Sequence, residues 1–276
     1  MEEQMPMIDF FGQKISRLIM GGNPFSGNSH VSRELDDAMM DYYSTDNIKK
    51  AVVHALECGV NTIQVRADRH IFRILRELRN EGHMPLWIAQ TASEFRSFEG
   101  NVRQTMTYEP AAIYHHGTLT DKLFKAGEYG AIEENLKILR STGRPVGIGT
   151  HMPQVIEYAE EHGWDVDFYM ACVYNLSVKD RVSSAITGIS NANESFYEAD
   201  IPVMYQTIRS TAKPCLAFKI LGASRRCATP ETVKSAFAEA FASIKPCDAV
   251  VVGMYQGMFD QIRANSDIVK EIGHAV

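Results

Sequence analysis

The sequence predicts an α/β fold, a closed (β/α)8 TIM barrel, on three observations. Eight apolar stretches of strand length recur along the 276 residues, and segments with helical spacing of apolar residues lie between them. Near-continuous apolar strands that alternate with helices are typical of a parallel sheet covered by helices. The length is close to the roughly 250 residues of one such barrel. We therefore expect a single domain over residues 1–276, with a doubly wound open sheet as the alternative.

The first element is a small hairpin, because residues 7–15 place a glycine between two apolar flanks. The eight expected strands are 17–22, 61–67, 86–92, 111–117, 145–150, 167–174, 214–221 and 248–254. The clearest expected helices are 47–58, 70–81, 131–142, 152–162, 230–244 and 258–272. Four of these helices are followed by a glycine, which suits a left-handed cap: Gly59, Gly82, Gly143 and Gly163.

Two connections are longer than the others. Residues 23–46 follow the first strand and residues 176–200 follow the sixth, so both lie on the face where the strands end. Long loops on this face are commonly lids or binding loops, and some are only additions to the fold. We keep both interpretations open.

Composition excludes several classes of partner. The net charge is −6 and the pI is about 5.9, so no basic surface for nucleic acid or anionic membranes is expected. The five cysteines form no CxxC pair, which indicates free thiols in a reducing compartment. The sequence shows neither a secretory signal nor an apolar run of roughly 18 residues. We expect a cytoplasmic protein with a small-molecule partner, and its oligomeric state stays open.

Polar residues gather where the predicted strands end, and in a barrel these ends face one pocket. These residues are Asn23, His30, Arg66, Asp68, Arg69, His70, Gln90, His115, His116, His151, Asn175, Lys219 and Tyr255. Five of the nine histidines are among them, which favours a functional pocket. We expect His70, His115, His116, His151 and Lys219 to be catalytic, and His30 and the remaining residues to bind substrate.

His115 and His116 are neighbours on one strand, so their side chains should point to opposite faces. We expect at least one of His115, His116 and His151 to take part in catalysis. For any one of them, the alternative is a hydrogen bond to a neighbouring loop.

Lys219 stands in an apolar stretch, where an ammonium group is costly unless it is paired or faces the pocket. It could bind an anionic substrate, act as a base or form a Schiff base. The alternative is a salt bridge to a carboxylate such as Asp68.

Arg225 and Arg226 follow the seventh strand, a region where many barrels hold phosphate. They are candidate cofactor or anion ligands, and the alternative is that both are solvated surface charges. A divalent metal is a further expectation, since imidazole and carboxylate groups converge at the strand ends. No HxH or HExxH spacing assigns its ligands.

The order of motifs resembles the aldo-keto reductase superfamily. The resemblance rests on the hairpin and on the stretches 15–22, 55–63, 114–116, 146–150, 173–175 and 253–265. It implies the same barrel with an N-terminal hairpin. It also implies a cofactor site near the end of the chain, at Gln261 and Asn265.

The reductases of that family use a tyrosine as general acid, supported by a lysine and an aspartate, and a histidine that orients the carbonyl. Here the aspartate position falls on Gln64, the lysine position on Gln90 and the tyrosine position near Arg69 and His70. Arginine cannot donate the proton that tyrosine provides. The histidine alone has a counterpart, at His116 or its neighbour His115. Gln261 stands where many members bind the 2′-phosphate through arginine, which argues against NAD(P).

We therefore expect an enzyme on an aldo-keto-reductase-like barrel that acts on a small polar carbonyl, sugar or sugar-acid compound. Acid/base chemistry of a lyase, isomerase or epimerase is favoured, with or without a metal. The first alternative is an NAD(P)H-dependent oxidoreductase in which His70 or His116 donates the proton. The second is a binding barrel without catalytic activity.

Overall fold

The computed structural model describes residues 4–180, 182–191 and 194–274 of the chain. Eight parallel strands close into a barrel, each paired with its neighbour in the sequence and the last with the first. They are β3 (Leu18–Gly21), β4 (Thr62–Arg66), β5 (Leu86–Gln90), β6 (Ala112–His115), β7 (Val146–Thr150), β8 (Phe168–Cys172), β9 (Cys215–Phe218) and β10 (Ala249–Gly253). The predicted (β/α)8 fold is confirmed, and every predicted strand is present.

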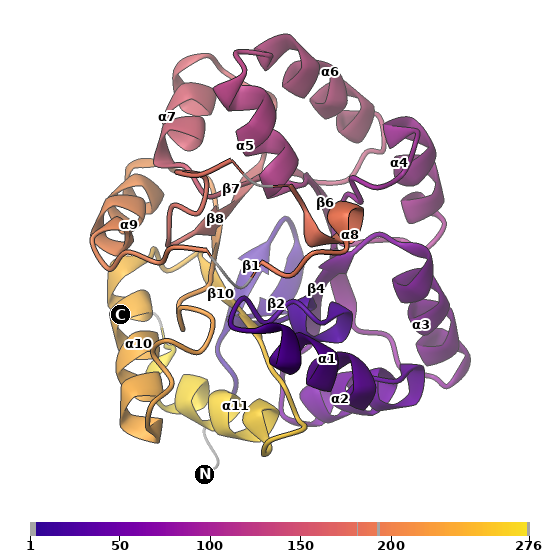
Figure 1. Ribbon diagram of the computed structural model, residues 1–276, viewed down its shortest axis with the longest axis vertical. Coiled ribbons are helices and arrows are strands. Elements are labelled where there is room, and N and C mark those ends of the chain that lie inside the picture. The colour runs from indigo at the N-terminus through magenta and orange to yellow at the C-terminus, as the bar shows by residue number, and fades with distance from the viewer. Residues whose placement is uncertain (1–3, 181, 192–193, 275–276) are drawn as a thin grey trace.

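Helices surround the barrel (Figure 1). They are α1 (Arg33–Tyr42), α2 (Thr45–Glu57), α3 (Arg69–Asn80), α4 (Phe98–Met106), α5 (Gly117–Lys125), α6 (Tyr129–Arg140), α7 (Pro153–Glu161), α8 (Ser184–Thr187), α9 (Asp200–Ser210), α10 (Pro230–Ser243) and α11 (Gln261–Ile272), with a 3-10 turn η1 (Asn23–Ser26). The six predicted helices correspond to α2, α3, α6, α7, α10 and α11. The four glycines predicted as caps all have positive φ, between 64° and 91°.

The predicted hairpin is present, and it packs against the N-terminal end of the barrel. It consists of β1 (Met7–Phe10) and β2 (Gln13–Ser16), paired antiparallel. Its apolar side chains, such as Phe10 and Ile15, pack with residues that fill the barrel interior, among them Phe168 and Leu216. These apolar side chains fill the N-terminal part of the barrel interior, which leaves the C-terminal end for polar groups.

Two glycines of β7 make room for large side chains in the barrel. A Cβ atom on Gly147 would lie 2.5 Å from the ring of Phe168, and one on Gly149 would lie 3.0 Å from the ring of Tyr114. A Cβ on Gly149 would also lie 3.0 Å from the backbone nitrogen of Gly117. Glycine in this strand therefore lets the start of α5 approach the barrel wall closely.

The two long connections meet above the C-terminal end of the barrel, which faces the viewer in Figure 1. Residues 23–46 form η1 and α1, and residues 176–200 include the short helix α8. The Ser184 hydroxyl donates to Asn28 Oδ1 at 2.5 Å, and Ser190 donates to Asp36 at the same distance. These bonds hold the second connection against the first over the barrel mouth.

In the described part of the chain, no helix combines the length and the apolar composition that crossing a membrane requires.

Candidate active site

A small polar cavity lies at the C-terminal end of the barrel, and we call it the central cavity. Its volume is about 90 Å³. Its lining includes Asn23, His30, Gln64, Arg66, Gln90, Tyr114, His116, His151, Phe218 and Lys219 from the strand ends and the first connection, and Ser183, Ser184 and Asn191 from the second. The structure thus brings together seven of the thirteen polar strand-end residues singled out in the sequence.

A buried carboxylate orients His151. The Nδ1 atom of His151 lies 2.7 Å from Oδ2 of Asp121, a residue of α5 that is 2% exposed. Thr150 and Ser177 each donate a hydroxyl hydrogen bond to the same carboxylate at 2.5 Å, and the backbone N–H of His151 donates to it as well. Burial alone would raise the pKa of Asp121, but its bond to His151, the charge of His151 and the two hydroxyl bonds outweigh burial, so the pKa is lowered.

Because Asp121 is a carboxylate, it accepts the proton on Nδ1 of His151. This hydrogen bond fixes one tautomer of the neutral imidazole, the form in which Nε2 is the basic atom. His151 lines the central cavity, and its ring packs edge-on against Phe218. The arrangement is that of a histidine held ready to accept or donate a proton.

A second chain of groups runs through Lys219. Its Nζ atom lies 2.7 Å from Nε2 of His30, and Nδ1 of His30 lies 2.7 Å from Oε2 of Glu194. Asn23 also contacts Nε2 of His30, at 3.4 Å. A proton that leaves Lys219 can therefore pass to His30, where the Glu194 carboxylate would stabilise the imidazolium. Glu194 belongs to the second long connection, so this connection completes the chain.

His30 and Lys219 both have left-handed backbone conformations, with φ of 60° and 63°. This region costs a residue with a side chain about 1–2 kcal/mol relative to the right-handed region. Strained backbone persists where surrounding structure holds it, and it is concentrated at functional sites. Here the side chains of the two strained residues are hydrogen-bonded to each other.

The floor of the central cavity is a chain of neutral hydrogen bonds. Gln64 donates to the hydroxyl of Tyr114 at 2.7 Å, and that hydroxyl donates to Gln90 at 2.7 Å. Burial raises the pKa of Tyr114 far above its ordinary value, so the phenol stays protonated. These groups can fix the hydroxyl or carbonyl groups of a substrate.

The two adjacent histidines separate as strand alternation predicts. His116 lines the central cavity, and its Nδ1 atom lies 3.2 Å from the hydroxyl of Ser93. His115 is fully buried on the outer side of β6, where it contacts Thr120 at 2.7 Å and Asn135 at 3.1 Å. Burial lowers the pKa of His115 to about 4. We therefore leave His115 out of the site and assign it a packing role.

Three other predicted site residues lie around the start of α3. Asp68 caps this helix by accepting from the backbone N–H of Ile71, and it also contacts Arg66. Arg66 forms a second ion pair with Glu94 at the edge of the cavity. Arg69 and His70 are exposed in the first turn of α3 and do not line the cavity. We do not include Arg69 or His70 in the site.

The two arginines after β9 are engaged within the protein. Arg225 donates to the backbone oxygens of His30 and Gly222 and stacks on the ring of Phe196, 3.8 Å from its centroid. Arg226 pairs with Glu239. Their guanidinium groups hold the loops of the mouth together, so the structure offers no support for an anion site built from them.

Three of the remaining predicted residues line a separate groove of about 630 Å³ beside β9 and β10: Gln261, Asn265 and Tyr255. Gln261 accepts from the backbone N–H of Tyr255 at 2.9 Å. Asn175 lies apart, where its side chain accepts from the backbone of Ser177. The groove has a mainly apolar lining, with Val233, Val252 and Ile268 among its residues, and it meets the central cavity at Asn23, His30 and Lys219.

Across residues 4–180, 182–191 and 194–274, no three His, Cys, Asp or Glu side chains are grouped in a way that could hold a metal ion. The predicted divalent metal therefore stays a prediction without assigned ligands.

The sequence did not point to Asp121 or Glu194. Asp121 follows Gly117 by four residues, so it lies on the face of α5 that touches the barrel, and this spacing was the available signal. Glu194 lies in a connection rich in serine and asparagine that has no periodic pattern, so no local signal marks it.

No family model and no curated protein matches the sequence. Solved structures similar to the chain include a truncated 3-deoxy-D-arabino-heptulosonate 7-phosphate synthase from Thermotoga maritima, with 13% identity over 98% of this chain and 91% of that chain and a TM-score of 0.56. Gox0644 in its apo form has 10% identity over 96% and 88%, with a TM-score of 0.58. An aldolase named QR15 has 12% identity over 83% and 88%, with a TM-score of 0.51.

The resemblance to the aldo-keto reductase superfamily is wrong. It rested on short motifs, and no family model matches the sequence they belong to. The enzymes that the similar structures name are a synthase and an aldolase, not reductases. Several of the motifs reflect features common to such barrels, namely apolar strands and glycine after helices. At these low identities, the likeness shows that the chain has a TIM-barrel fold.

Proposed function

We propose that the chain is an enzyme that moves a proton at a carbon next to a carbonyl group in a small polar, sugar-like compound. This is the chemistry of an isomerase, an epimerase or a lyase. The observation that carries the proposal is the pair formed by Asp121 and His151, which opens into the same cavity as Lys219 and His116.

His151 is the proposed general base, because the Asp121 carboxylate holds its Nδ1 proton and leaves Nε2 as the basic atom. Removing a proton next to a carbonyl places negative charge on the carbonyl oxygen. The ammonium group of Lys219 can stabilise that charge within the cavity. His116 lines the same cavity and can return the proton to a different atom or face of the substrate.

The cavity lining also favours a hydroxylated substrate. Amide and hydroxyl groups of Asn23, Gln64, Gln90 and Tyr114 are arranged at its floor and wall. Such groups discriminate strongly between compounds with and without matching hydroxyls. One similar structure is named as a 3-deoxy-D-arabino-heptulosonate 7-phosphate synthase, which supports this class of substrate, and another is named as an aldolase, which supports lyase chemistry.

A second candidate function is a lyase that forms a Schiff base on Lys219. It is favoured by the 2.7 Å contact between Nζ of Lys219 and Nε2 of His30. The amine must be neutral to attack a carbonyl, and His30, backed by Glu194, can take its proton. Its nitrogen would bond to the carbonyl carbon, and the carbonyl oxygen would leave as water.

Two measurements test these functions. Incubation with C3 to C6 aldoses, ketoses and their acids in D2O should show deuterium at the carbon next to the carbonyl, detected by proton NMR. Borohydride added to the same mixtures should fix a substrate on Lys219, detected by peptide mass spectrometry, only if a Schiff base forms. Exchange without trapping supports the first function, and trapping supports the second. If no compound in the panel shows either deuterium exchange or borohydride trapping, both proposed functions are contradicted.

A further inference from the structure

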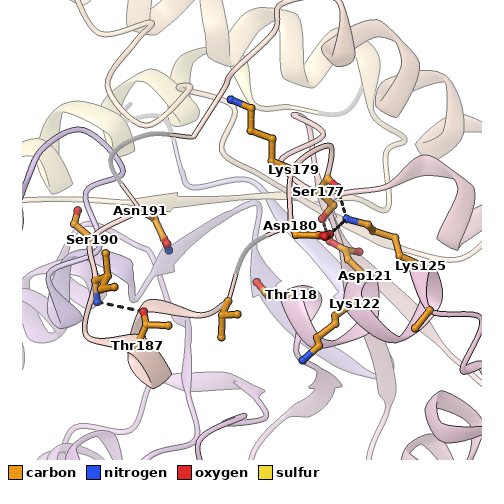
Figure 2. A pocket seen from close by; sticks show the side chains of 13 residues that line it. Thr118, Asp121, Lys122, Lys125, Ser177, Lys179, Asp180, Thr187, Ser190 and Asn191 are labelled. Carbon is orange, nitrogen blue, oxygen red and sulfur yellow. Dashed lines mark hydrogen bonds and ion pairs between the residues drawn. The ribbon is translucent and has the colours of Figure 1, made fainter.

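A second cavity adjoins the central one, and we call it the outer pocket. It lies between α5 and the segments 177–180 and 182–191, and its volume is about 700 Å³. Thr118 and Asn191 line both cavities, and Asp121, which orients His151, lines the outer pocket (Figure 2). A molecule that enters the central cavity from this side would therefore pass through the outer pocket.

The central cavity is too small to hold a whole sugar-sized substrate. Its volume of about 90 Å³ compares with roughly 300–1,000 Å³ for typical small-molecule sites. Only the reacting end of a substrate fits beside His151 and Lys219. The rest must extend into an adjoining space, and the outer pocket has the required volume.

The charge balance of the outer pocket is positive once its internal pairs are considered. Asp121 accepts bonds from His151, Thr150 and Ser177, and Asp180 pairs with Lys125 at 2.5 Å. In Figure 2 the side chains of Lys122, on α5, and Lys179, on the facing segment, extend in opposite directions. Neither has a side-chain hydrogen bond or ion pair to another described residue, and both are exposed.

The alternative places for an anionic group are less suitable. Arg225 and Arg226 are engaged with backbone oxygens, Phe196 and Glu239. Among the described residues that line the groove beside β9 and β10, the only lysine or arginine is Lys219, and its Nζ atom contacts His30. Among the described residues next to the central cavity, unengaged ammonium groups are found at the outer pocket.

We infer that the outer pocket binds the anionic end of the substrate, a phosphate monoester or a carboxylate, and that Lys122 and Lys179 attract it by their positive charge. This inference rests on the proposed function, since it places the reacting end at His151. The lysines supply charge at an open site, so affinity for the anionic end should fall as salt is added.

Calorimetric titration with D-ribose, D-ribonate and D-ribose 5-phosphate tests the inference. The comparison needs wild-type protein, the double variant Lys122→Gln/Lys179→Gln and the control Lys137→Gln, which removes an exposed lysine of α6. We expect the wild type and the control to bind at least one anionic compound about ten-fold more tightly than ribose. The double variant should lose most of that preference. Which anionic compound binds more tightly distinguishes phosphate from carboxylate.

Equal affinity of the wild type for all three compounds, or an unchanged preference in the double variant, would overturn the inference. The proposed function is scored separately by deuterium exchange. A His151→Gln variant should keep the preference for anionic compounds and lose exchange, so a failure of either claim can be recognised.

Discussion

The Nδ1 atom of His151 lies 2.7 Å from a carboxylate oxygen of Asp121, although the two residues are 30 positions apart in the sequence. β7 ends at Thr150 and delivers His151 to the mouth, while α5 brings Asp121 beneath it. The pair defines which nitrogen of the imidazole can act as a base. It is the relationship on which our account of the site depends.

Replacing Asp121 with asparagine tests the role of this pair. The amide is neutral and can donate toward Nδ1, which would favour the wrong tautomer of His151. We expect the exchange rate to fall by about 10²- to 10⁴-fold, the range for loss of general acid–base catalysis. Substrate affinity should change little. A rate within three-fold of wild type in a folded variant would show that Asp121 has only a packing role.

Glu194→Gln tests the chain through His30. The amide can still contact Nδ1 of His30, but it no longer stabilises a positive imidazolium. We expect an approximately ten-fold lower rate, and a pH–rate profile that moves to lower pH because a negative charge is removed. Glu198→Gln, in the same connection, is the matched control. A rate loss without a change in the pH profile would indicate that Glu194 only holds the connection in place.

A pair of substitutions at Lys219 measures the backbone strain of the site. Lys219 has φ of 63°, which glycine adopts without cost and alanine does not. Both variants lose the ammonium group and should lose activity. We expect the free energy of unfolding, measured by urea denaturation, to be about 1 kcal/mol higher for Lys219→Gly than for Lys219→Ala. Equal stability of the two variants would mean that the backbone there is not strained.

His115 should make the folded protein sensitive to acid. Its pKa is lowered to about 4 by burial, against 6.5 in the unfolded chain, so the unfolded state binds more protons between these values. The contribution of His115 to the free energy of unfolding is therefore fully present above pH 6.5. It is lost as the pH falls toward 4, by up to about 3 kcal/mol. Urea midpoints between pH 7 and 4 should fall less steeply in His115→Gln than in wild type. If the urea midpoints of the two proteins fall equally with pH, the lowered pKa of His115 is contradicted.

The barrel could be predicted from the sequence because each of its strands is a continuous apolar stretch, as in β8 and β10. The parallel strands of a barrel all end at one face, so the sequence also predicts that His151, Lys219, His30 and Gln90 lie at the mouth. These inferences depend on local pattern and on the geometry common to parallel barrels.

The partners of those residues could not be predicted in the same way. Asp121 reaches His151 from a helix, and Glu194 reaches His30 across 164 residues of sequence. Such contacts depend on tertiary packing and leave no local pattern. The family resemblance failed for a related reason, since motifs such as Gly21-Gly22 and residues 146–150 serve the barrel geometry and carry no information about chemistry.

The most direct measurement compares deuterium incorporation by wild-type protein and the His151→Gln variant, with the sugars and sugar acids supplied in D2O. We predict that the wild type exchanges the hydrogen next to the carbonyl of at least one compound, and that the variant is slower by 10²-fold or more. Exchange that proceeds equally in both proteins would contradict the assignment of His151 as the base.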